Sequence, residues 1–199
     1  MAGIAYELEG ALYLNLTNAC PNRCRFCVRE YAPGVGGYDL WLDREPTAEE
    51  IIAAAGDVSP YREVVFCGYG EPTCRLETLL DVARALHGRG VPLRLNTNGL
   101  GNLIAGRDIL PELAGRIDAV SVSLNAPNNE EYQRLCRPAF GEKAFPAVLD
   151  FLRRAKEYIP RVVASVVPYG GLDLEACRRL AEELGAEFRI RQMIPDGDR

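Results

Sequence analysis

Histidine is almost absent from this sequence, and basic residues are fewer than acidic ones. His87 is the only histidine among 199 residues, so the chain has little imidazole with which to build a metal site. The 23 lysines and arginines are outnumbered by 28 aspartates and glutamates, which gives a formal net charge of −5. A chain with this charge has no global positive field to attract nucleic acid.

Long apolar runs and the features of a secretory leader are missing as well. The longest apolar runs, such as 161–168, are far too short to cross a bilayer. The first ten residues carry Glu7 and Glu9 and have neither a basic region nor an apolar core, which argues against a signal peptide. We therefore expect a cytoplasmic protein with no membrane partner. Thiols stay reduced there, and clustered cysteines bind metal more often than they form disulfides.

Segments with strand and helix character alternate along the chain. The predicted strands are 11–17, 63–69, 92–99, 117–125, 161–168 and 187–194. The predicted helices are 48–56, 76–87, 102–113, 128–135, 143–158 and 172–185. This alternation with short connections predicts an α/β fold with a parallel sheet, formed by a single domain over 1–199.

Polar residues and cysteines follow the ends of several predicted strands. Right-handed crossovers would place every strand's C-terminal end on one edge of the sheet, where α/β folds bind their ligands. The residues that this topology collects there are Cys20, Gly70, Glu71, Asn98, Ser123 and Asn125. We therefore expect the functional site at this edge.

Three cysteines, Cys20, Cys24 and Cys27, lie within eight residues directly after the first predicted strand. On a helix this spacing would form one face, so a buried apolar stripe is one interpretation. Pro21 and the arginines between the cysteines indicate a turn instead. A structural zinc site needs four ligands, and no CxxC or CxH pair elsewhere supplies the fourth. Three thiolates fit a cubane iron–sulfur cluster better, and they leave one of its irons open to a substrate or cofactor.

The CxxxCxxC pattern, with Phe26 before its third cysteine, resembles the signature of the radical S-adenosylmethionine (radical SAM) superfamily. The resemblance implies that Cys20, Cys24 and Cys27 hold a [4Fe–4S] cluster whose open iron is chelated by S-adenosylmethionine. It implies a partial (β/α)6 TIM-like barrel with parallel strands. It also implies reductive cleavage of S-adenosylmethionine to a 5′-deoxyadenosyl radical, which abstracts hydrogen from an unidentified substrate. Phe26 is then expected at the cofactor.

The segment GYGEPT, at 68–73, is similar to the GGEP motif of this family. The resemblance implies that Gly70, Glu71 and Pro72 bind the amino group of the methionine moiety. Tyr69 departs from the pattern, because a glycine is usual at its position, and we expect a steric or stacking variation there.

The segment SVSLNAP, at 121–127, resembles the family's fourth-strand element. The resemblance implies that Ser123 and Asn125 contact the carboxylate or ribose of the cofactor, with Asn98 at the same edge. It also implies an arginine that pairs with the methionine carboxylate. Arg137 is our choice and Arg134 the alternative, since a guanidinium offers a carboxylate a planar fork of donors.

Two features near these motifs leave alternatives open. Cys136 precedes Arg137 and either faces the cavity or is structural, as free cysteines more often are. Arg189 and Arg191 alternate on the last predicted strand and so face the same side. Burying both unpaired would be costly. Our hypothesis is that they bind an anionic substrate group at the open barrel edge.

The chain also resembles, more closely, the small TatD-associated radical SAM subfamily.

The superfamily resemblance implies reduced flavodoxin or ferredoxin as electron donor. Arg23, Arg25 and Arg29 either form the docking patch for this donor or are solvated charges. The substrate is a small molecule, a protein or RNA, although the acidic charge does not indicate nucleic acid.

Two other functions stay open. One is an iron–sulfur or zinc module for binding or electron transfer, and the other is a glycyl-radical activase.

Overall fold

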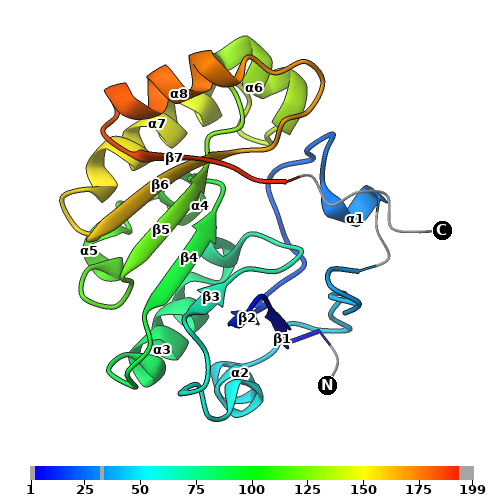
Figure 1. Ribbon diagram of the computed structural model, residues 1–199, viewed down its shortest axis with the longest axis vertical. Coiled ribbons are helices and arrows are strands. Elements are labelled where there is room, and N and C mark those ends of the chain that lie inside the picture. The colour runs from blue at the N-terminus through cyan, green and yellow to red at the C-terminus, as the bar shows by residue number, and fades with distance from the viewer. Residues whose placement is uncertain (1–2, 32–33, 193–199) are drawn as a thin grey trace.

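The computed structural model describes residues 3–31 and 34–192, and within them seven strands form one curved sheet (Figure 1). The strands are, in sheet order, β1 (Ala5–Leu8), β2 (Ala11–Leu14), β3 (Val64–Phe66), β4 (Leu93–Thr97), β5 (Ala119–Ser123), β6 (Arg161–Val166) and β7 (Glu187–Ile190). Strands β2 to β7 run parallel, and only β1 pairs antiparallel, with β2. The predicted α/β fold is thereby confirmed. The sheet is an open barrel whose two edges are β1 and β7.

Helices cover the outer side of this sheet. They are α2 (Ala48–Ala55), α3 (Leu76–Leu86), α4 (Gly101–Ala105), α5 (Leu110–Leu113), α6 (Asn129–Cys136), α7 (Ala144–Ala155) and α8 (Leu174–Glu183). The short helix α1 (Val28–Tyr31) lies apart from them, on the open side of the barrel in Figure 1. Two 3₁₀ turns, Pro72–Arg75 and Gly141–Lys143, complete the described elements. None of the helices in the described part of the chain is long and apolar enough to span a membrane.

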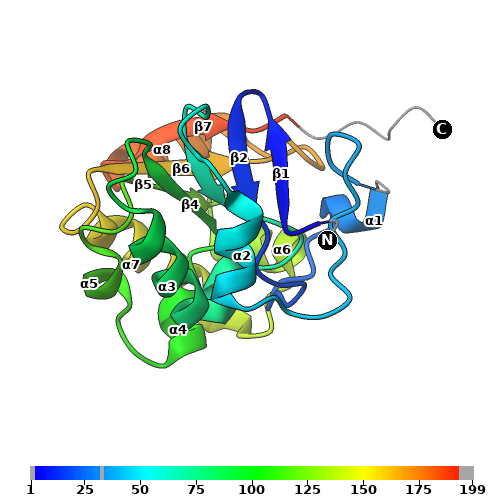
Figure 2. The same ribbon diagram turned by 90° about the horizontal axis from the view of Figure 1, so that it is seen from below.

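Strand β1 was not predicted, and it makes the sheet mixed at one edge. Glu9 and Gly10 both have positive φ, 48° and 75°, which gives the two-residue turn that joins antiparallel strands with the correct twist. The strand is only four residues long, so its alternation is a weak signal. Figure 2 shows the hairpin standing beside α2, which packs against it.

The single helix predicted at 102–113 is wrong, because two short helices replace it. Gly106 ends α4 in the left-handed conformation (φ 67°), which is the usual helix stop. Pro111 lies in the first turn of α5, where proline is favoured. Between them, the Asn102 side chain accepts a 3.0 Å hydrogen bond from the Ile109 backbone N–H. The predicted strand end at 193–194 lies outside the described residues.

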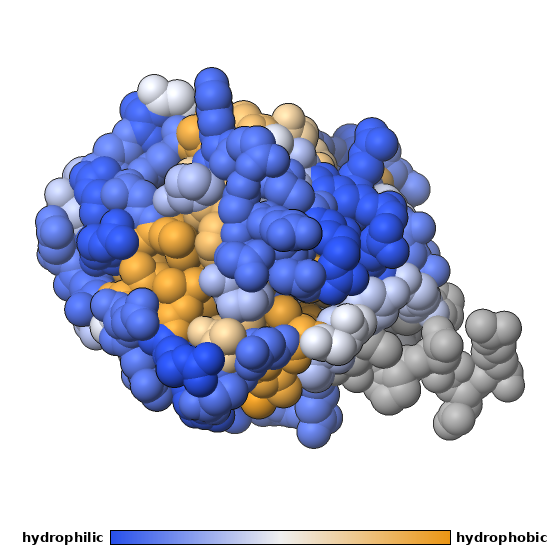
Figure 3. Space-filling view, turned by 90° about the horizontal axis from the view of Figure 1, so that it is seen from above, coloured by the Kyte–Doolittle hydropathy of each residue, from blue (hydrophilic) through white to orange (hydrophobic). Residues whose placement is uncertain are grey.

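The outer helices are amphipathic, and each buries one face against the sheet. In α8, Cys177 and Ala181 are fully buried, whereas Arg178 and Arg179 are exposed. Figure 3 shows the molecule from above, where hydrophilic side chains surround an area of hydrophobic surface. The buried faces of the helices and the outer face of the sheet together form the main core.

The inner, concave face of the sheet is polar. The strand register places Val65, Arg94, Ala119 and Arg161 in one row across it. Asn96 and Ser121 follow in the next row, and Ser123 and Ser165 in the one after that. A closed (β/α)8 barrel fills this space with branched aliphatic side chains. Here the described rows carry polar side chains instead, and Arg94, Ser121 and Ser165 among them are buried.

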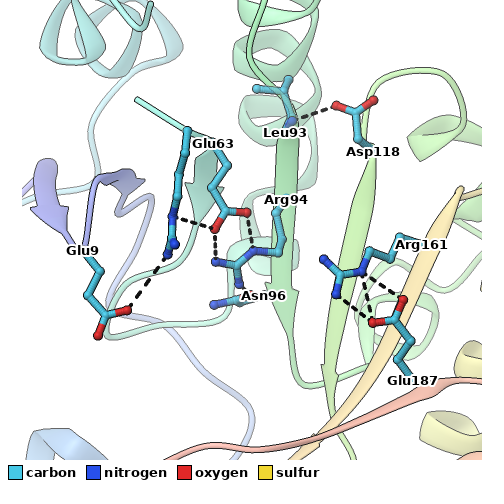
Figure 4. A network of polar contacts seen from close by, with 9 residues as sticks. Glu9, Glu63, Leu93, Arg94, Asn96, Asp118, Arg161 and Glu187 are labelled. Atoms are coloured by element: carbon cyan, nitrogen blue, oxygen red, sulfur yellow. Dashed lines mark hydrogen bonds and ion pairs between the residues drawn. The ribbon is translucent and has the colours of Figure 1, made fainter. Parts of the chain in front are cut away.

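Ion pairs neutralise the concave face near the N-terminal ends of its strands (Figure 4). Glu63 accepts two hydrogen bonds, of 2.9 and 3.0 Å, from the nearly buried guanidinium of Arg94. Arg161 and Glu187 pair at 2.7 Å on neighbouring strands, where both side chains are about half exposed. The charges at this end of the barrel are therefore matched within the protein.

We expect the two ion pairs to contribute unequally to stability. Glu63→Gln leaves the Arg94 guanidinium buried without a counter-charge and should lower the free energy of unfolding by about 3 kcal/mol. Glu187→Gln, the control, breaks an exposed pair and should cost at most about 1 kcal/mol. Urea denaturation of the metal-free variants measures both, and equal losses would contradict this account.

Candidate metal and cofactor site

The three cysteines lie on a loop that follows β2 at the C-terminal edge of the sheet. On one side, the chain before Cys20 pairs with the GYGEPT segment after β3. The N–H of Gly70 donates to Thr17 O at 3.0 Å, and the N–H of Glu71 donates to Ala19 O at 2.8 Å. A Cβ atom at position 70 would lie 2.3 Å from Thr17 O, so only glycine permits this approach.

On its other side, the cysteine loop caps the C-terminus of α6. The N–H groups of Arg23 and Arg25 donate to Cys136 O and Leu135 O at 3.0 and 2.9 Å. Carbonyls in the last turn of a helix have no partner within the helix, so the loop satisfies two of them. Arg137 ends α6 in the left-handed conformation (φ 46°), which turns the chain away and leaves room for the loop.

The thiols of Cys20, Cys24 and Cys27 are half-buried, and each has a different neighbour. Asn98 Nδ2 lies 4.0 Å from Cys20 Sγ, and Arg29 Nε lies 3.4 Å from Cys27 Sγ. Hydrogen bonds to cysteine sulfur are among the features by which a protein tunes an iron–sulfur cluster.

The protonation of these thiols is set by their surroundings. Burial, with the nearby Glu71 carboxylate, raises the pKa of Cys20 to about 12. A hydrogen bond with Cys136, together with burial, raises the pKa of Cys24. Both thiols are therefore neutral until a metal displaces their protons.

This donor set fits a cubane cluster. The three cysteines supply thiolates, and in a cubane each thiolate binds a separate iron. Among the described residues, no three histidine, cysteine, aspartate or glutamate side chains converge on one point as ligands of a single ion. A mononuclear zinc site would require that convergence, whereas a cluster does not.

Cys136 is the fourth thiol near the loop. It is fully buried and belongs to the main core, where Asn125 Nδ2 lies 3.9 Å from its sulfur. Cys136 thus faces Cys24 from within the core and does not lie on an open cavity wall.

Glu71 joins the ends of β3 and β4. Its carboxylate accepts hydrogen bonds of 2.7 Å from Thr97 Oγ1, from Thr73 Oγ1 and from the Asn98 N–H. Burial raises the pKa of this carboxyl, and the donors on Thr73, Thr97 and Asn98 oppose the rise. Pro72 is buried at the start of the following 3₁₀ turn. In this structure Glu71 is thus fixed by protein donors, and its contact with the cofactor's amino group stays a prediction.

Ser123 and Asn125, at the end of β5, meet an arginine that was not among the predicted cofactor ligands. Arg191 Nη2 donates to Ser123 Oγ and to Asn125 Oδ1, both at 3.2 Å. Arg137 is exposed and lines a separate pocket of about 490 Å³ with Pro21, Arg23 and Ala139. The alternation of arginines along the last strand was the signal that pointed to Arg191.

Arg134, the alternative to Arg137, pairs with Glu131 at 2.5 Å on its own helix. In the described part of the chain neither Arg134 nor Arg137 forms a hydrogen bond with Ser123 or Asn125, so the structure does not gather them at the predicted position. Their contact with a cofactor carboxylate stays a prediction.

Aromatic side chains flank the cysteine loop. Phe26 is half-buried, with its ring centroid 5.8 Å from that of Tyr169. Tyr69 is buried, and its ring packs edge-on against Trp41 at 5.1 Å. The residue in place of the usual glycine therefore anchors the long loop after the cysteines. The predicted place of Phe26 at the cofactor is not tested by these contacts.

Comparison with known proteins decides the family. The family model described as Radical SAM superfamily matches residues 14–184. The chain belongs to the radical SAM superfamily. A [4Fe–4S] cluster and S-adenosylmethionine are the cofactors of this superfamily.

Curated relatives of this radical SAM chain include two kinds of enzyme. A probable GTP 3′,8-cyclase of Thermococcus kodakarensis is 30% identical over 81% of this chain and 48% of its own length. A probable dual-specificity RNA methyltransferase RlmN of Prochlorococcus marinus is 33% identical over 67% of this chain and 38% of its own length. The chain thus spans less than half of these relatives.

Solved structures support the fold. SuiB of Streptococcus suis, bound to the precursor peptide SuiA, superposes with a TM-score of 0.67 at 13% identity, over 95% of this chain and 40% of SuiB. Methylornithine synthase (PylB) gives a TM-score of 0.62 at 15% identity, over 95% of this chain and 56% of PylB. At such identities the likeness concerns the fold alone, and it confirms the predicted partial barrel.

The neighbouring thiols of Cys24 and Cys136 provide a matched test of which cysteines bind the cluster. After anaerobic reconstitution, Cys24→Ser should lower bound iron by more than about tenfold, because a cluster ligand is lost. Cys136→Ser, altered at a neighbouring buried thiol, should keep the iron content of the unaltered protein. Iron and acid-labile sulfide analysis measures both, and equal loss in the two variants would make Cys136 a fourth ligand.

Proposed function

We propose that this chain reductively cleaves S-adenosylmethionine to methionine and a 5′-deoxyadenosyl radical, which abstracts hydrogen from a substrate. When bound, the [4Fe–4S] cluster supplies the electron for this cleavage. The observation that carries the proposal is the three-thiol loop at the edge of the sheet, with the neighbouring Cys136 held in the core. Three ligands leave one iron free for the cofactor.

The proposed roles of the chain's own residues follow from their places at this edge. Cys20, Cys24 and Cys27 hold the cluster. The cofactor's methionine moiety would lie beside the cysteine loop and the segment Gly70–Pro72, whose backbone pairs with the chain just before Cys20. The remaining proposed cofactor contacts are Phe26, Asn98, Ser123, Asn125 and Arg137.

The proposed substrate is polar. The concave face carries the half-buried Asn96 and Arg191, and polar groups of this kind would be left unpaired against an apolar substrate. Two of the relatives carry names that refer to GTP and to RNA. A nucleotide or an RNA nucleotide is therefore our first candidate, with small polar metabolites and peptides as the others.

The proposed electron donor is reduced flavodoxin or ferredoxin. Arg23 and Arg25 are exposed beside the cysteine loop and can meet an acidic donor. Arg29 is half-buried and donates to Asn18 O at 3.0 Å, so its guanidinium binds the backbone of the cysteine loop. The organisation of 1–199 as a single domain, the cytoplasmic location and the likeness to the TatD-associated subfamily stay predictions.

Formation of 5′-deoxyadenosine tests the proposal. Anaerobically reconstituted protein, reduced with dithionite, should convert S-adenosylmethionine to methionine and 5′-deoxyadenosine. Cys24→Ser should reduce the yield to background, because the cluster is lost, and Cys136→Ser should retain it.

Two outcomes would favour other functions. Tightly bound zinc without iron, or an iron cluster that leaves S-adenosylmethionine intact, would favour a binding or electron-transfer module. Cleavage that occurs only with a partner protein, and leaves a radical on that partner's glycine, would favour an activase.

A further inference from the structure

Arg191 is a half-buried cation on the concave face, just after β7. Its side chain reaches across the sheet to the end of β5, where Nη2 contacts Ser123 Oγ and Asn125 Oδ1 at 3.2 Å. Both acceptors are neutral. The Nε atom is buried and has no hydrogen-bond partner. The Nη2 end of the guanidinium is thus held in place, while the Nε donor is unused.

No carboxylate lies within ion-pair distance of Arg191 among residues 3–31 and 34–192. The contrast with Arg94 is direct, because that guanidinium, on the same face, donates two hydrogen bonds to the Glu63 carboxylate. Burial lowers the pKa of Arg191, and the thiols of Cys24, Cys67 and Cys136 oppose this shift. A partly buried charge without a counter-charge among the described residues is costly, and an anionic ligand would lower that cost.

We propose that Arg191 binds an anionic group of the substrate, a carboxylate or a phosphate, on the concave face above β5. This inference rests on the proposed function and specifies its substrate class. Arginine suits the task, because its planar donors match the oxygens of either group. Arg189 lies two residues earlier on the same face and is exposed, so it adds positive charge near Arg191.

The anion that meets Arg191 has two sources to be separated, the substrate and the methionine carboxylate of the cofactor. Ser123 and Asn125, which accept the hydrogen bonds of Arg191, are themselves among the proposed cofactor contacts, so its position alone does not separate the two. The affinity for S-adenosylmethionine, measured below, does.

Anion binding by the holoenzyme tests the proposal. The protein, reconstituted with iron and sulfide and saturated with S-adenosylmethionine, is titrated anaerobically with inorganic pyrophosphate and followed by its thermal midpoint. We expect pyrophosphate to raise the midpoint, and Arg191→Gln to weaken its binding at least about tenfold, as the loss of a charged hydrogen-bond donor implies. Arg191→Lys should keep part of the affinity. The matched control, Arg189→Gln, should change it less than about threefold, since an exposed charge contributes little.

Two further measurements separate the sources of the anion and guard against misfolding. Equilibrium dialysis should give the same affinity for S-adenosylmethionine in Arg191→Gln as in the unaltered protein. The thermal midpoint of ligand-free Arg191→Gln should equal or exceed that of the unaltered protein, because a partly buried charge without a counter-charge is gone.

Three results would overturn the inference. They are pyrophosphate binding unchanged in Arg191→Gln, no pyrophosphate binding by the unaltered holoenzyme, and a tenfold loss of S-adenosylmethionine affinity, which would assign Arg191 to the cofactor. None of these readouts requires turnover. A protein that binds pyrophosphate through Arg191 but forms no 5′-deoxyadenosine would contradict the proposed function and leave this inference standing.

Discussion

Backbone hydrogen bonds hold the cysteine loop between two neighbours, and the placement of the other site residues depends on them. Gly70 and Glu71 pair with the chain just before Cys20, and Arg23 and Arg25 cap the free carbonyls of α6. These bonds fix the loop without using the thiols, which stay available to metal. The same pairing brings the β3 end, with Glu71, against the loop, and Glu71 in turn fixes the end of β4. A loop held in this way positions its ligands before any cofactor arrives.

Charge is distributed unevenly along the concave face. At the N-terminal ends of the strands, Arg94 and Arg161 are matched by Glu63 and Glu187. At the C-terminal ends, Arg191 donates to two neutral oxygens, and no carboxylate of the described residues lies within ion-pair distance of it. Functional sites commonly keep polar or charged groups that have no partner in the free protein, and this lowers the stability of the fold. The end of the barrel that lacks compensation is the end where the cysteines lie.

Much of this arrangement could be predicted from the sequence, because it depends on local patterns. Six parallel strands and the edge that they share follow from the alternation of apolar runs. Strand β1 and the break at Gly106 were missed, since a four-residue strand and a single helix stop are weak signals within a longer periodic segment. The partner of Ser123 could not be found either, as Arg191 lies 68 residues away and reaches it across the sheet. Contacts of that kind depend on how the strands curve.

The account depends on one iron of the cluster having no protein ligand. Mössbauer spectroscopy of protein reconstituted with ⁵⁷Fe tests this directly, because it resolves inequivalent irons. Addition of S-adenosylmethionine should change the signal of one iron in four, as the amino and carboxylate groups bind it. A spectrum in which all four irons are unaffected would mean that the cluster is fully ligated by the protein, and would contradict the account.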